Sequence, residues 1–159
     1  MWSLKPIILG ILAGMRSMSA LTFTSLYLER KVYLKPADKL TEILASSEAN
    51  LVIPALAVGE LVADKLPFIP DRIQPPALFA RMASGAISGQ AVEAAEDRDR
   101  VFGALTGGLA AAGSTFFFFY LRKELGRRTR IPDPVLGLLE DSLVIGLGAT
   151  LLNSDGRLG

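Results

Sequence analysis

The chain has 159 residues, of which 50% are hydrophobic and 21% charged, and its mean hydropathy is +0.39. Seventeen basic and sixteen acidic residues leave a net charge of +1, so no overall field would attract nucleic acid, and no nucleic-acid motif is present. Cysteine and histidine are both absent, which excludes disulfides, thiol chemistry and the commonest ligands of transition metals. We therefore expect no nucleic-acid partner, no metal and no cofactor.

Charge-poor segments of helical length follow one another along the chain. A bilayer core of about 30 Å requires roughly 20 residues of helix. We therefore predict an all-α polytopic membrane bundle of four to five transmembrane helices, forming one domain in the inner membrane. The segments are 6–28, 51–66, 77–92, 101–121 and 134–152.

The first segment resembles a signal peptide at its start, because Lys5 precedes an apolar run. Arg16 interrupts that run, which then resumes to Leu28, and no small-residue cleavage site stands out. We expect one retained transmembrane helix over residues 6–28.

The third segment is the weakest, since only eleven uncharged residues separate Arg81 from Glu93. It either spans the membrane, with Arg81 reaching the interface, or dips in and returns. For five spans, the loops on the two sides carry eight and seven basic residues, so the positive-inside rule gives no orientation. A re-entrant third segment would give a cleaner charge pattern. Insertion in both orientations, with a homodimer as the assembly, is also compatible with the count.

Two stretches suggest an internal repeat. Seven of nineteen positions are identical between residues 10–28 and 103–121, and Glu60 aligns with Glu140 in the segments that follow. The repeat halves would be about 6–66 and 101–152, joined by 67–100. If the third segment spans, the halves are inverted, an architecture typical of transporters.

Three segments contain Gly-x-x-x-Gly, a pattern that lets helix backbones approach closely in a membrane. We predict that these glycines pack helices together. They are Gly10, Gly14, Gly85, Gly89, Gly103 and Gly107.

Charged residues inside apolar segments are the candidates for a binding site or pathway. Arg16 lies deep in the first segment, where a charge costs roughly 2.5–3.5 kcal/mol on insertion scales, so it should find a partner in the interior. Glu60 and Asp64 share a helix face, whereas the adjacent Glu140 and Asp141 diverge by about 100°. We expect Arg16 to pair with Glu60, Asp64 or Glu140. The full candidate set is Arg16, Glu60, Asp64, Arg81, Glu140 and Asp141.

The membrane interface has its own candidates. A proline-rich stretch after the second segment ends the helix, and its charges Lys65, Asp71 and Arg72 suit the head-group zone. After the fourth segment comes a basic cluster that would set topology or contact anionic lipid. Its members are Arg122, Lys123, Arg127, Arg128 and Arg130.

Four motifs carry a resemblance across nearly the whole chain. They are GMRSMSA (14–20), GELVADKLPFIPDR (59–72), PPALFARMASGAISG (75–89) and LLEDSLVIGLG (138–148). On these motifs the chain resembles a bacterial integral-membrane family of unknown function. The resemblance implies a small multi-span inner-membrane protein and no established activity.

Three functional hypotheses follow. The first is a transporter or channel for a small solute, ion or proton, with the carboxylates as titrating or cation-binding groups. The second is a non-catalytic scaffold or subunit that binds partner helices through its Gly-x-x-x-Gly faces. The third is a lipid-head-group enzyme using Asp64, Asp71 and Arg72, although no catalytic motif is recognisable, so no catalytic residue is assigned.

Overall fold

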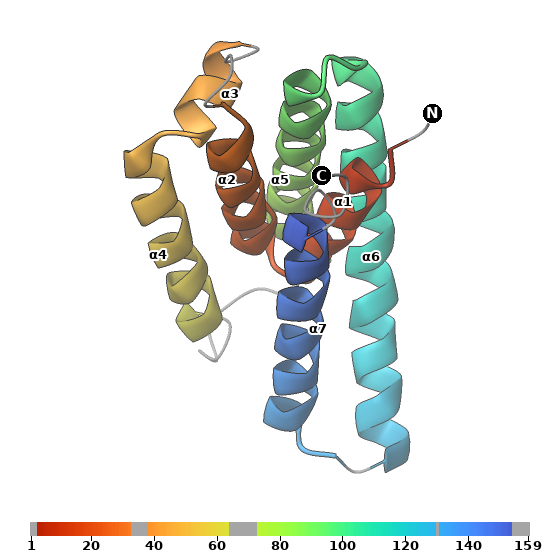
Figure 1. Ribbon diagram of the computed structural model, residues 1–159. Coiled ribbons are helices and arrows are strands. Elements are labelled where there is room, and N and C mark those ends of the chain that lie inside the picture. Colours follow the sequence, from red (N-terminus) through yellow and green to blue (C-terminus); the bar gives the residue numbers. More distant parts are fainter. Residues whose placement is uncertain (1–2, 33–37, 64–72, 130, 154–159) are drawn as a thin grey trace.

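Figure 1 shows a computed structural model of the chain, which describes residues 3–32, 38–63, 73–129 and 131–153. These residues form seven helices and no strand, which confirms the all-α prediction. The helices are α1 (Lys5–Met15), α2 (Ser17–Val32), α3 (Lys39–Leu44), α4 (Ser47–Ala63), α5 (Pro75–Ala95), α6 (Arg100–Thr129) and α7 (Asp133–Asn153).

The first apolar segment is a helical hairpin rather than one helix. Between α1 and α2, Arg16 is extended, with φ −146° and ψ 110°, and the chain reverses direction there (Figure 1). Lys5 and Tyr27 each lie eleven positions from Arg16, and the Lys5 Nζ donates to the Tyr27 hydroxyl at 2.8 Å. Residues equidistant from a break meet only if the two helices are antiparallel. The expectation of one continuous helix over residues 6–28 is therefore wrong.

The third apolar segment lies in one unbroken helix, α5, from Pro75 to Ala95. A short turn connects it to α6, and Asp97 in that turn adopts a left-handed φ of 58°. The two helices run antiparallel, and α1 packs against both of them (Figure 1). The part of the chain that turns back is thus the first segment and not the third.

Glycines allow α1, α5 and α6 to approach each other closely. A Cβ atom on Gly107 would lie 2.2 Å from the carbonyl oxygen of Gly85, and one on Gly89 would lie 2.1 Å from that of Gly103. A Cβ atom on Gly10 would lie 2.3 Å from the carbonyl oxygen of Gly107. Because each clash is with backbone, no side-chain rotation relieves it. The Gly-x-x-x-Gly faces of these helices pack against one another within the chain.

The distribution of polar and apolar side chains is unusual for a protein in water, where charged residues are almost never fully buried unless they are paired and large apolar patches are rarely exposed. Large apolar side chains are exposed along α4, α6 and α7. They include Leu51, Val52, Leu56, Val58, Val62, Val101, Leu105, Leu109, Phe117, Leu138, Leu139, Leu143 and Ile145. The buried polar and charged residues include Arg16, Thr24, Ser25, Arg81, Ser88, Glu93, Thr115 and Glu140.

Two of the described helices, Arg100–Thr129 and Pro134–Asn153, are long and apolar enough to cross a membrane, by length and composition.

Candidate functional site at the break between α1 and α2

The tip of the α1–α2 hairpin lies beside the middle of α6. This helix has 30 residues and a length of about 45 Å. Ser114 and Thr115, half-way along it, donate their hydroxyl protons to the carbonyl oxygens of Ile11 (2.9 Å) and Gly14 (3.3 Å). The hairpin therefore ends deep in the bundle and far from both ends of its longest helix.

A break at this depth exposes backbone groups that need partners. The last carbonyls of a helix and its first N–H groups have no intrahelical hydrogen bonds, and leaving them unpaired in the interior is costly. At the end of α1, Arg81 of α5 supplies the donors. Its Nη1 donates to the carbonyl oxygens of Gly14 (3.1 Å) and Met15 (3.0 Å). A cation at this position also suits the negative end of the helix dipole.

At the start of α2, Glu60 of α4 supplies the acceptors. Its carboxylate accepts hydrogen bonds from the backbone N–H of Ser17 (3.0 Å), the Ser17 hydroxyl (2.7 Å) and the N–H of Met18 (2.8 Å). The negative charge suits the positive end of the α2 dipole. Glu60 also lies 3.9 Å from the Arg81 Nη2, so the groups that cap the two helix ends are themselves a distant ion pair.

Arg16, the residue at the break, reaches across to α7. Its Nε donates to the Asp141 Oδ1 at 3.0 Å, and its Nη2 lies 2.8 Å from the same oxygen. Sequence reasoning expected Glu60, Asp64 or Glu140 as the partner. Among the described residues, Asp141 lies beside Arg16, while Glu60 is directed to the start of α2 and Glu140 points to another helix. Asp64 lies outside the described residues.

We call Arg16, Glu60, Arg81 and Asp141 the break site. Its four charges come from four parts of the fold and balance, with two guanidinium groups and two carboxylates. Arg16 and Arg81 are almost completely buried, at 4% and 5% exposure. Ser84 adds a neutral hydrogen bond, since its hydroxyl donates to the Ser17 carbonyl at 2.5 Å.

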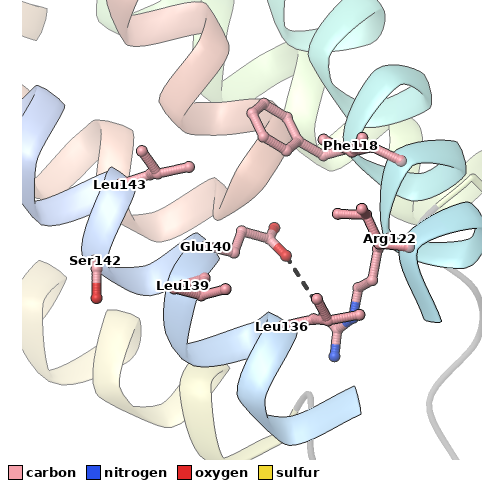
Figure 2. A pocket seen from close by; sticks show the side chains of 9 residues that line it. Phe118, Arg122, Leu136, Leu139, Glu140, Ser142 and Leu143 are labelled. Carbon is pink, nitrogen blue, oxygen red and sulfur yellow. Dashed lines mark hydrogen bonds and ion pairs between the residues drawn. The ribbon is translucent and has the colours of Figure 1, made fainter. Parts of the chain in front are cut away.

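Glu140 lies next to Asp141 in sequence but outside the break site. Figure 2 shows its carboxylate directed toward α6, where the Arg122 Nη1 lies 3.4 Å away. Adjacent residues on a helix diverge by about 100°, which explains how neighbouring carboxylates serve different partners.

Several predicted residues lie outside the described part of the chain. They are Asp64, Lys65, Asp71, Arg72 and Arg130.

Sequence reasoning missed a second charged cluster, at the open end of the hairpin. Glu96, at the end of α5, accepts hydrogen bonds from Lys5 of α1, Tyr27 of α2 and Arg98 of the following turn. Arg98 also donates to Glu93 through its Nε (2.9 Å) and Nη2 (3.1 Å). The stretch EAAEDRDR (93–100) was the indication of this cluster in the sequence. Its first glutamate is the first charged residue after Arg81 and follows eleven uncharged residues of the same segment. This cluster ties both ends of the hairpin to the α5–α6 turn.

The family described as a domain of unknown function, DUF4126, matches residues 6–153. The chain belongs to the DUF4126 family. The matched region contains the whole break site, and membership confirms the resemblance to a family without an assigned activity. No curated protein and no solved structure matches this DUF4126 chain.

Proposed function

We propose that this DUF4126 protein is a multi-pass protein of the inner membrane that moves a small solute, ion or proton through the break site. One observation carries the proposal. A helix breaks in the buried middle of the bundle, where Glu60 of α4 and Arg81 of α5 hold the two ends that the break exposes. Asp141 of α7 binds the Arg16 side chain at the break itself.

The exposed surface supports a membrane location. Soluble monomers rarely expose contiguous apolar patches above a few hundred Å². Here, large apolar side chains line the outer faces of three helices, while arginine, glutamate, serine and threonine side chains are buried. This arrangement suits a protein whose outer surface meets lipid and whose interior holds the polar groups.

The hairpin supports a re-entrant element within that membrane protein. The 11 residues of α1 rise only about 16 Å, roughly half of a bilayer core. Non-helical backbone at such depth is tolerated only where protein surrounds it or a water-filled cavity adjoins it. In our proposal α4, α5, α6 and α7 cross the bilayer and enclose the hairpin, which enters and leaves on the same side.

The chemistry of the break supports transport. In secondary transporters, the exposed ends of broken helices bind the substrate and its coupling ion near the bilayer midplane. In this conformation, Glu60 occupies the N–H groups that would bind an anionic group, and Arg81 occupies the carbonyls that would bind a cation. A proton or cation that neutralises Glu60 would weaken its hold on Ser17 and Met18 and free the start of α2. Glu60 and Asp141 are therefore the proposed carriers of the transported or coupling charge.

A scaffold remains the alternative. The Gly-x-x-x-Gly faces that a scaffold would offer to partners are packed together within the chain. A partner would have to use the exposed faces of α4, α6 or α7 instead. The head-group enzyme rests on Asp64, Asp71 and Arg72, which lie outside the described residues, and no observation favours it.

The test uses purified protein in liposomes. Proton flux would be followed with a pH-sensitive dye trapped inside, driven by a potassium diffusion potential, and sodium flux with labelled sodium. We expect flux above that of protein-free vesicles, abolished in Glu60→Gln and in the neutral pair Arg16→Gln/Asp141→Asn. Glu124→Gln, which alters a more exposed ion pair on α6, is the control and should leave flux unchanged.

Wild-type flux at the level of protein-free vesicles would contradict transport of these ions. So would flux that persists unchanged in both break-site variants. If wild type shows no flux while Arg16→Leu lowers the abundance of the protein in cells, the scaffold becomes the better explanation.

A further inference from the structure

A groove of about 450 Å³ lies between the second half of α6 and the first half of α7 (Figure 2). Its walls are mostly apolar, and it opens on the outer surface, where Leu139 and Leu143 are more than half exposed. The apolar lining is Phe118, Leu121, Leu125, Leu136, Leu139 and Leu143.

One ion pair forms the polar part of this groove. Arg122 of α6 and Glu140 of α7 line it, with their nearest atoms 3.4 Å apart, and Glu140 is 5% exposed. Gly137 of α7 lies opposite the guanidinium, and a Cβ atom there would lie 3.5 Å from the Arg122 Nη2. That distance is an ordinary van der Waals contact, so the guanidinium group lies directly against α7 at this position.

The end of the groove beside Arg122 is strongly basic. The charge-free stretch of α6 ends at Leu121, and the helix continues through Arg122 and Lys123 to Thr129. Arg127 and Arg128 near its end are 76% exposed. Among the side chains that the structure describes at this end of the groove, four are basic and two, Glu124 and Glu140, are carboxylates. A membrane-spanning α6 would place this excess of positive charge in the head-group zone, just beyond the apolar groove.

We propose that the groove binds one acyl chain of an anionic phospholipid whose phosphate is held by Arg122, with Lys123 and Arg127 adding positive charge. The planar guanidinium group matches phosphate in bidentate geometry, and an apolar slot beneath it matches a hydrocarbon chain. Basic residues near a membrane surface favour anionic over zwitterionic lipid. The inference rests on the proposed membrane location but is independent of transport, because lipid binding requires no flux.

The experiment is native mass spectrometry of the detergent-purified protein with added phosphatidylglycerol or phosphatidylcholine of identical acyl chains. We expect the bound fraction to be about fivefold higher for phosphatidylglycerol, the scale of one basic residue at a membrane surface. Arg122→Gln should remove this preference, and Arg122→Lys should restore part of it. Arg128→Gln, in an exposed pair with Glu124, should keep it.

A second pair of variants tests the groove itself. Leu143→Trp fills the groove and should lower lipid binding several-fold, whereas Leu138→Trp lies on the same helix outside the lining and should not. Equal binding of the two lipids, equal losses in the Arg122→Gln and Arg128→Gln variants, or full binding in Leu143→Trp would overturn the proposal. A lipid-free dimer that Leu143→Trp dissociates would show that a second copy occupies the groove instead. Wild-type flux at the level of protein-free vesicles, together with normal lipid binding, would count against transport alone.

Discussion

Arg16 and Asp141 are 125 positions apart in the chain, yet the Arg16 Nη2 lies 2.8 Å from an Asp141 carboxylate oxygen in the middle of the bundle. The pair joins the tip of the α1–α2 hairpin to α7, the last helix of the described residues. Arg16 is nearly inaccessible, so its charge depends on partners within the protein. The pair therefore links the geometry of the break to the position of α7.

Removing one member of this pair should destabilise the protein strongly. A buried charge left without its partner typically costs about 3–5 kcal/mol, whereas replacing both members costs much less. We expect Asp141→Asn to lower the thermal unfolding midpoint in detergent far more than Arg16→Met/Asp141→Leu does. Glu124→Gln, at an exposed ion pair, should change stability by less than about 1 kcal/mol. If the losses of stability in Arg16→Met and in Asp141→Leu, measured singly, add up to the loss in the double variant, the two residues are not coupled.

Glu60 should stabilise the protein through the position of its carboxylate oxygens as well as through its charge. Glu60→Gln keeps an acceptor for one of the N–H groups of Ser17 and Met18, while Glu60→Ala leaves both without this acceptor. The loss of a helix-capping acceptor costs about 0.5–2 kcal/mol. We therefore expect the unfolding midpoint to fall in the order wild type, Glu60→Gln, Glu60→Ala. Equal midpoints for the two variants would mean that Glu60 does not cap α2.

The sequence predicted helices well because long apolar segments leave few alternatives, and it singled out Arg16 because an arginine is conspicuous in such a segment. It did not predict the hairpin. Arg16 is flanked by Met15 and Ser17, and neither proline nor a turn motif marks the reversal. The break is held by Glu60 and Arg81, which come from other helices. A local pattern cannot reveal a distortion whose stabilising partners are distant in sequence.

The contact between Arg16 and Asp141 was not predicted, for a related reason. The proposed repeat aligned Glu60 with Glu140 and drew attention to both. The two repeat segments differ in structure. Residues 10–28 are divided between α1 and α2, which form a hairpin, while residues 103–121 lie within the unbroken α6. The rotation of α7 about its own axis decides whether Glu140 or Asp141 faces the hairpin, and packing sets that rotation.

The glycine contacts predict a contrast between two positions of α6. A Cβ atom at Gly107 would lie 2.2 Å from a backbone oxygen of α5, whereas one at Gly113 would meet nothing within 4 Å. Gly107→Ala should therefore destabilise the protein by about 1–3 kcal/mol, as overpacking does. Gly113→Ala should be neutral or stabilising, because alanine favours a helix over glycine by about 0.5–1 kcal/mol. Thermal unfolding of the two variants measures the difference, and equal midpoints would refute the close α5–α6 contact.

A re-entrant α1–α2 hairpin places the residues before and after it on the same side of the membrane, whereas a single spanning helix places them on opposite sides. If α1 and α2 enter and leave on the same side, Ser3 before α1 and Ser47 at the start of α4 face the same compartment, and Thr129 at the end of α6 faces the other. The chain has no cysteine, so Ser3→Cys, Ser47→Cys and Thr129→Cys each introduce a single thiol. We expect a membrane-impermeant thiol reagent applied to intact cells to treat the first two alike and Thr129→Cys oppositely, with permeabilised cells as the control. Opposite labelling of Ser3→Cys and Ser47→Cys would mean that residues 6–28 cross the membrane once. Labelling of about half the molecules at all three positions would indicate insertion in both orientations, and an antiparallel homodimer would then be the assembly to test.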